Sequence, residues 1–197
     1  MKIIAVTGGS GCGKTFFANL LVERLSKTVV LPLDSYYFDR PDNIPSDQYD
    51  FDGPQAFDFD LYHEHLECLI SGKSVHMPHF GYVSGKRKTS FSEIDPEEHL
   101  IIEGLHVLLH SRSRKLLSYS FYMESPMDVA ICRMCLRDIK NFDVTAEYRL
   151  KQYLKFVRPA YFEHIEPTKQ YANIIVKNNY DSPLDEFVDD FLLNKKL

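Results

Sequence analysis

The sequence predicts an α/β protein with a mainly parallel five-stranded sheet flanked by helices. The first reason is a set of short apolar runs that are continuous rather than alternating, which is typical of strands buried on both faces. The second is that helical patterns separate these runs, because strands alternating with helices imply right-handed crossovers in a parallel sheet. The predicted strands lie at residues 3–6, 29–33, 100–102, 121–123 and 174–176.

Three helices are predicted from apolar spacing and from start signals. In residues 15–25 the apolar side chains recur three and four positions apart, which lines one face of a helix. Ser125 and Ser182 are each followed by a proline, a residue suited to a first helical position. Asp185 follows Ser182 by three positions, which suits a capping box at the start of the last helix.

One stretch, about residues 36–92, breaks the alternation and is predicted to be an insertion beside the sheet. It is rich in Asp, Pro, Gly and aromatic residues around one helical pattern, residues 59–70, which Gly72 ends. Its second part, residues 74–91, suggests an irregular hairpin. Since irregular segments beside a sheet often carry specificity, we expect substrate contacts here.

The composition excludes several classes of protein. With 197 residues, 44% hydrophobic and 26% charged, the chain fits a single domain. The net charge of −5 offers no basic field for nucleic acid, and no apolar run approaches the roughly 20 residues that span a bilayer. Four scattered cysteines do not form a disulfide framework, so we expect a soluble cytoplasmic protein with reduced thiols and neither nucleic-acid nor membrane partners.

The strongest motif follows the first predicted strand and begins the first predicted helix. In that context a Gly-x-x-x-x-Gly-Lys-Ser/Thr string places backbone N–H groups and the positive helix end around phosphate oxygens. The lysine reaches the β- and γ-phosphates and the threonine hydroxyl binds magnesium. The motif therefore predicts nucleoside triphosphate binding by Gly8, Gly9, Ser10, Gly11, Cys12, Gly13, Lys14 and Thr15.

Two acidic residues stand at the carboxyl ends of predicted strands, where open α/β sheets place their ligands. Asp34 follows residues 29–33, and Glu103 follows residues 100–102. Glu103 is expected to hold Mg²⁺ or its water shell, and Asp34 to accept the proton of an attacking hydroxyl. Thr15, Glu103 and Asp34 are thus the predicted metal-site residues. The absence of an Asn/Thr-Lys-x-Asp guanine-reading string favours a small-molecule kinase over a GTPase switch.

Taken together these residues resemble the uridine–cytidine kinases of the uridine kinase and phosphoribulokinase group. The resemblance implies a P-loop kinase fold with a helical lid at about residues 138–158. It also implies Mg²⁺-dependent phosphorylation of a nucleoside 5′-hydroxyl by ATP or GTP, with uridine or cytidine as acceptor and a possible homo-oligomer. The matching segments are residues 8–15, 34–37, 49–54, 56–58, 78–87, 103–104, 137–138, 152–153, 166–169 and 171–172.

The resemblance also assigns roles by position. Asp34 becomes the catalytic base, with Lys14 at the phosphates, and Asp52 becomes the carboxylate that binds the ribose hydroxyls. A carboxylate suits that task because it accepts hydrogen bonds from two vicinal hydroxyls, and a deoxy analogue leaves it partly unpaired. By the same matching, Arg137 is expected at the nucleotide, and Phe80, Arg87 and Gln152 at the substrate.

Two segments depart from the family pattern. The tyrosine and histidine that read the base are here Phe80 and Gly85, which keep a stacking ring but no hydrogen-bonding side chain. The Glu-Arg-Gly-Arg-Asp run of the lid is replaced at residues 141–145, which removes two arginines. Two alternatives therefore stay open: another small-molecule hydroxyl acceptor, or a nucleotide-binding protein that has lost catalysis. The arginines could be compensated by Arg133, Arg137, Lys140 or Arg149.

Overall fold

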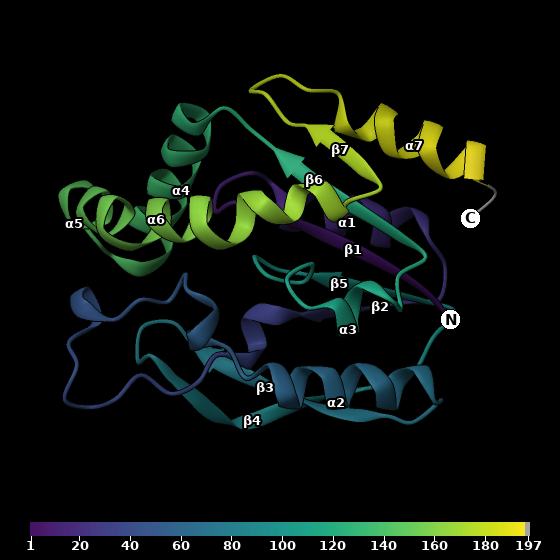
Figure 1. Cartoon of the computed structure of the whole chain (residues 1–197), viewed down its shortest axis with the longest axis horizontal. Helices are drawn as coiled ribbons and strands as arrows, with labels where there is room; N and C mark the ends of the chain where they lie inside the picture. Colours follow the sequence, from purple (N-terminus) through teal and green to yellow (C-terminus); the bar gives the residue numbers. More distant parts are fainter. Residues whose placement is uncertain (196–197) are drawn as a thin grey trace.

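A computed structural model describes residues 1–195 and contains the predicted parallel sheet (Figure 1). All neighbouring strand pairs are parallel, and the strand order is β2-β5-β1-β6-β7. Each predicted apolar run forms one strand, although Leu33 already belongs to a 3₁₀ turn that follows the second. The strands are β1 (Lys2–Gly8), β2 (Thr28–Pro32), β5 (His99–Glu103), β6 (Tyr119–Glu124) and β7 (Ile174–Lys177).

The predicted helices form, but two of the predicted starts use other contacts. The Ser125 hydroxyl donates to the backbone oxygen of Asn178, 2.6 Å away, and does not cap its helix. Ser182 accepts from the N–H of Asn179, so the capping box with Asp185 is wrong. In both cases the hydroxyl forms its hydrogen bond with a backbone group of the loop after β7. The helices concerned are α1 (Lys14–Arg24), α4 (Met127–Phe142) and α7 (Leu184–Lys195).

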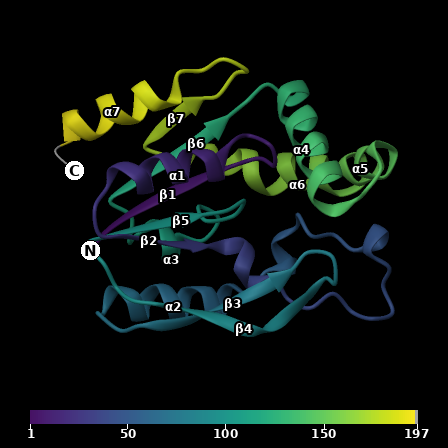
Figure 2. The same cartoon turned by 180° about the vertical axis from the view of Figure 1, so that it is seen from behind.

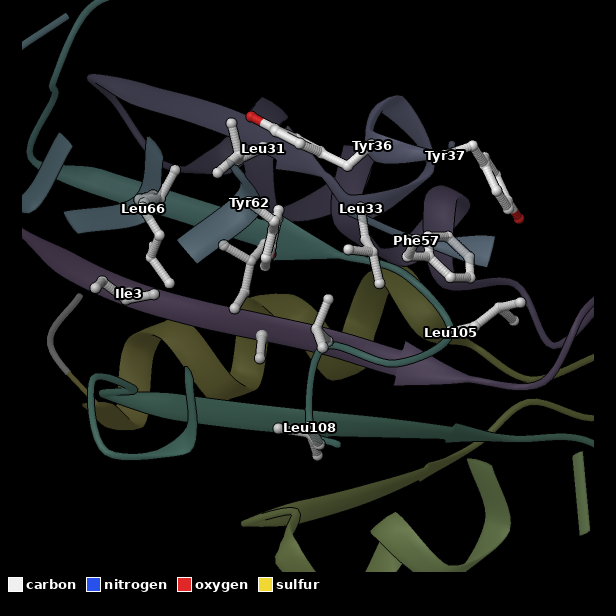
Figure 3. Close-up of a cluster of buried hydrophobic side chains, with 14 of the residues drawn as sticks. Ile3, Leu31, Leu33, Tyr36, Tyr37, Phe57, Tyr62, Leu66, Leu105 and Leu108 are labelled. Carbon is white, nitrogen blue, oxygen red and sulfur yellow. The ribbon is translucent and has the colours of Figure 1, made fainter. Parts of the chain in front are cut away.

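Alternation along the central strand divides the apolar side chains between two cores. Ile4 and Val6 point to one face, where they pack with α1 and α7; Figure 2 shows α1 lying across β1. Ile3 and Ala5 point to the opposite face and join the cluster drawn in Figure 3. That second cluster contains Leu31 and side chains of the insertion, so the insertion is anchored to the sheet by apolar packing.

The insertion consists of α2 (Phe59–Ile70), the short loops before it, and the antiparallel hairpin of β3 (Val75–Gly81) and β4 (Lys86–Ile94). The α2 bounds and the hairpin agree with the prediction, although β4 extends to Ile94 and the register shifts between Pro78 and Phe80. Asp58 caps α2, because its Oδ1 accepts from the N–H of Leu61. Both views place the hairpin and α2 along one side of the sheet (Figures 1 and 2).

A helical segment follows α4; α5 (Ala146–Gln152) lies beyond the carboxyl ends of the strands, and the helix that contains α6 (Arg158–Ala160) runs back toward the sheet (Figure 1). The segment also contains π-helical turns at Tyr153–Val157 and Tyr161–Ile165. π-helical turns are frequent at functional sites. The short α3 (Ser111–Arg114) precedes β6. Within residues 1–195 no helix is both long and apolar enough to cross a membrane.

Candidate functional site

The loop between β1 and α1 has the shape of a phosphate cradle. Gly11 and Gly13 take φ values of 78° and 88°, which favour glycine. A Cβ atom on Gly11 would lie 2.1 Å from the backbone oxygen of Ala130, so no side chain fits there. Lys14 Nζ donates to the backbone oxygen of Gly9 at 3.0 Å, which holds the ammonium across the loop. The loop therefore offers backbone N–H groups and a positive charge to an anion.

Asn178, at the end of β7, holds this loop from the far edge of the sheet. Its Nδ2 donates to the backbone oxygen of Cys12 at 2.9 Å, and its side chain is buried. A Cβ atom on Gly13 would lie 2.3 Å from that Nδ2, so the close approach requires a glycine at Gly13. The sequence pattern did not identify Asn178, because the contact joins residues 166 positions apart.

A cavity of about 430 Å³ opens at the carboxyl ends of the strands, between the phosphate loop, the hairpin and the helical segment. It brings together most of the side chains predicted from the sequence. Those in its lining are Ser10, Lys14, Thr15, Asp34, Asp52, Phe80, Glu103, Arg137 and Gln152. The lining also contains Tyr82 and Arg149, together with Tyr37, Phe51, Met134 and Tyr148, which were not predicted as site residues.

Two carboxylates at strand ends face Lys14 in this cavity. Burial raises the pKa of Asp34, and the nearby Lys14 opposes that shift. Burial also raises the pKa of Glu103 to about 7, with Lys14 and a hydrogen bond from Thr15 acting in the other direction. Desolvated carboxylates around one lysine attract a further cation or hold a proton. Asp34 Oδ1 is buried without a hydrogen-bond partner among residues 1–195, which is uncommon for a carboxylate oxygen away from a functional site.

Hydrogen bonds to its backbone hold Asp52 in place, so its carboxylate is not used for this and lines the cavity. Asp50 Oδ1 accepts from the N–H groups of Asp52 and Gly53, at 2.9 and 3.0 Å. His106 Nε2 lies 2.7 Å from the Asp52 backbone oxygen and therefore donates to it. Burial lowers the pKa of His106 to about 4, so the ring is neutral near pH 7. Burial, followed by repulsion from Asp50, raises the pKa of Asp52 to about 7.

Among the four predicted substrate-binding residues, Arg87 is the one that does not line the cavity. Its guanidinium donates to the backbone oxygens of Tyr36 and Tyr37 and pairs with Asp58 at 3.0 Å. It thereby ties β4 to the turn that carries Asp34. Gln152 does line the cavity, and its Nε2 donates to the backbone oxygen of Asp47 at 3.0 Å.

Two arginines that line the cavity, one in α4 and one in α5, are both paired with the same buried aspartate. Asp138 is fully buried in α4; its Oδ1 accepts from Arg137 Nε at 2.7 Å, and its Oδ2 pairs with Arg149. The Nε of Arg149 is buried and has no hydrogen-bond partner in the described chain. Of the four compensating cations that the sequence suggested, only Arg137 and Arg149 line the cavity, whereas Arg133 binds backbone oxygens of Asn178 and Asn179.

The comparisons with known proteins agree with this arrangement. The Phosphoribulokinase / Uridine kinase family matches residues 3–183. A uridine kinase of Borrelia turicatae is 36% identical over 190 residues, covering 89% of this chain and 86% of that protein. A uridine kinase of Vibrio vulnificus is 35% identical over 182 residues, covering 88% and 85%.

Solved structures match with lower identity and support the fold. Phosphoribulokinase from Rhodobacter spheroides superposes with a TM-score of 0.66 at 17% identity, over 93% of this chain and 72% of that one. D-glycerate 3-kinase from Cryptococcus neoformans gives a TM-score of 0.62 at 14% identity, over 90% and 86%. A phosphate loop in a kinase-like α/β fold, together with relatives above 30% identity along most of the chain, identifies the group: this chain belongs to the phosphoribulokinase and uridine kinase family.

Proposed function

We propose that this chain is a Mg²⁺-dependent kinase that transfers the γ-phosphate of ATP or GTP to the 5′-hydroxyl of a nucleoside, with uridine or cytidine as first acceptors. The observation that carries the proposal is the convergence of Lys14, Asp34 and Asp52 in one cavity of about 430 Å³. A volume of this order suits a small-molecule ligand. Relatives named uridine kinase, about 35% identical along most of the chain, support the choice of acceptor.

Each side chain then has a defined task. Lys14 and the backbone of residues 8–15 bind the phosphates. Asp34 accepts the proton of the attacking hydroxyl. Asp52 accepts hydrogen bonds from the vicinal ribose hydroxyls, while His106 holds its backbone. Phe80 contributes a ring face to the cavity.

The oxygen donors beside Lys14 fit a hard cation. No group of three or more His, Cys, Asp or Glu side chains within residues 1–195 is arranged to hold a metal on its own. Mg²⁺ usually binds through one or two carboxylates together with waters and substrate phosphates. Thr15 and Glu103 would hold it, with Asp34 alongside. When bound, Mg²⁺ would neutralise charge on the phosphates.

We further propose that residues 138–158 form a lid and that residues 36–92 supply the acceptor site. Arg137, immediately before the lid, and Arg149, within it, both line the cavity; the charge of Arg137 partly offsets the raised pKa of Asp34 and Glu103, and that of Arg149 partly offsets the raised pKa of Asp52. Cations placed in this way can replace the two arginines that residues 141–145 lack.

A second acceptor class is favoured by Phe80 and Gly85, which offer no polar side chain to a pyrimidine edge. A Cβ atom on Gly85 would lie 3.0 Å from Arg40 Nε, so the hairpin tip packs closely where the family has a histidine. The structural neighbours include kinases named for other acceptors. The alternative is therefore phosphorylation of a different small hydroxyl compound at the same site.

The first experiment measures ADP formation from ATP and Mg²⁺ with uridine, cytidine, D-glycerate and sugar phosphates as acceptors. We expect nucleoside-dependent turnover that Lys14→Ala and Asp34→Asn each lower by at least about 100-fold. Lys73→Ala and Asp181→Asn change exposed residues of the same types and should keep full activity.

Turnover confined to non-nucleosides would select the second acceptor class. Nucleotide binding that depends on Lys14, without turnover on any acceptor, would reject the kinase proposal in favour of a nucleotide-binding role. Removal of Mg²⁺ with a chelator should abolish ADP formation in either kinase version.

A further inference from the structure

The tip of the hairpin reaches the proposed catalytic base. Tyr82 follows β3, and its hydroxyl donates to Asp34 Oδ2 at 3.3 Å, across 48 positions of sequence. The other carboxylate oxygen, Oδ1, is buried without a partner among the described residues. Asp34 therefore receives a hydrogen bond from a neutral hydroxyl, which Tyr82 donates.

The ring of Tyr82 is held by other aromatic rings of the cavity. Its centroid lies 5.6 Å from that of Phe80 and 6.4 Å from that of Tyr37, both edge-on. On the opposite side it lies 5.7 Å from Phe142, at the end of α4. Edge-on aromatic pairs stabilise a defined orientation. Tyr82 therefore joins the hairpin to the end of α4, at a half-exposed position of the cavity.

The contact made by Tyr82 is chemically the one that an acceptor must make. A kinase acceptor presents an alcohol O–H to the base, and the phenol presents an O–H to the same carboxylate. A tyrosine hydroxyl is protonated at neutral pH, so it is available as a donor. The phenol and an acceptor hydroxyl therefore compete for the same oxygen.

We infer that the Tyr82 hydroxyl is a substrate-mimicking gate, which occupies Asp34 Oδ2 until an acceptor hydroxyl displaces it and so keeps water from being activated there. This inference deepens the proposed function, because it rests on Asp34 being the base. It assigns to Tyr82 the selection of an alcohol acceptor over water, a role distinct from reading a base.

The reaction that the gate prevents is hydrolysis of the donor. When water occupies Asp34 Oδ2, its oxygen bonds to the γ-phosphorus and its proton passes to Asp34. The bond from that phosphorus to the β–γ bridging oxygen breaks, and ADP leaves with that electron pair. The products are ADP and inorganic phosphate. With an acceptor, the alcohol oxygen takes the place of water and the product is the phosphate ester.

The test is Tyr82→Phe, which removes the hydroxyl and keeps the ring. We expect ADP formation without acceptor to rise by about two- to ten-fold, the range of one neutral hydrogen bond. The KM for uridine should fall by a comparable factor, because the competing donor is gone, while kcat with uridine stays unchanged. Inorganic phosphate is measured alongside ADP to identify hydrolysis.

Two further variants separate the gate from a structural effect. Tyr180→Phe removes a phenol from an exposed position and should change neither rate. Combining Tyr82→Phe with Asp34→Asn should abolish the extra hydrolysis, because the water then has no base. A gain that persists without Asp34 would overturn the gate.

The remaining outcomes also decide the question. A higher KM for uridine in Tyr82→Phe, with unchanged hydrolysis, would mean that the phenol binds the acceptor, and the gate would be wrong. If wild type phosphorylates uridine and Tyr82→Phe behaves identically, the gate fails while the proposed function stands. If no acceptor is phosphorylated but Tyr82→Phe still raises Asp34-dependent hydrolysis, the nucleoside kinase proposal fails and the gate against water stands.

Discussion

At the scale of single residues, the Asp52 carboxylate is a site residue that lowers the stability of the folded protein when it is charged. Its carboxylate is desolvated beside Asp50, which raises its pKa to about 7, and Arg149 offsets only part of this shift. The folded protein therefore binds a proton at Asp52 more tightly than the unfolded chain does. The stability from this group is complete below the usual value of 3.8 and is lost as the pH rises through about 7. A charge kept at this cost is typical of a functional position.

Asp52→Asn should consequently stabilise the protein most at alkaline pH. We expect the melting temperature to rise by about 3–6 °C at pH 8, with the gain shrinking toward zero near pH 4. Thermal unfolding followed by circular dichroism between pH 4 and 8 measures this directly, with Asp181→Asn as the exposed control. A difference between variant and wild type that does not vary with pH would refute the assigned cause.

At the scale of elements, the segment after α4 brings an arginine to the cavity from a different place in the sequence. Residues 141–145 lack the two arginines of the family run, yet α5 presents Arg149 to the cavity. Buried Asp138 in α4 pairs with Arg149 and with Arg137, and thereby sets the position of both guanidinium groups. Thr145 stabilises the start of α5, since its hydroxyl accepts from the N–H of Tyr148 at 3.1 Å.

Arg149→Gln should lower kcat/KM for the acceptor by at least about 10-fold, because hydrogen bonds to a charged group are stronger than neutral ones. The KM for ATP should remain unchanged, since Arg149 lies near enough to Asp52 to shift its pKa and is not part of the phosphate loop. Lys140→Gln removes a positive charge from an exposed position of α4 that does not line the cavity, and should leave both constants as in wild type. Steady-state kinetics in both substrates separates these expectations; an equal loss in both variants would argue for bulk charge.

At the scale of the whole molecule, one sheet is shared by two apolar cores. Leu21 of α1 lies in the core on one face, and Leu66 of α2 lies in the core on the other, both fully buried. Because the strands contribute alternate side chains to each core, loss of packing on either face weakens the same strands. We therefore expect the insertion to unfold together with the sheet as one unit.

Leu21→Ala and Leu66→Ala should each reduce the free energy of unfolding by about 2–5 kcal/mol. Both variants should still unfold in a single transition, in which the signals of secondary structure and of aromatic side chains change together. Denaturant unfolding followed by far- and near-ultraviolet circular dichroism provides the measurement. Two separate transitions in Leu66→Ala would show that the insertion unfolds on its own.

Prediction from the sequence succeeded where the determining interactions are local. The five strands followed from continuous apolar runs, and α2 from one helical pattern that Gly72 ends. It failed at Ser125 and Ser182, whose hydroxyls bind the loop after β7. Local patterns can suggest a cap, but a distant backbone group can take the same hydroxyl.

By itself the sequence determined the α/β class, the phosphate loop and the acids at the ends of strands, because each depends on a short segment and on the direction of parallel strands. The tertiary structure alone decided that Arg87 braces the hairpin, that Arg149 enters the cavity and that Tyr82 binds Asp34. These contacts join residues far apart in the chain. Their geometry follows from how the insertion and the segment after α4 pack over the sheet, and short sequence patterns carry no information about that packing.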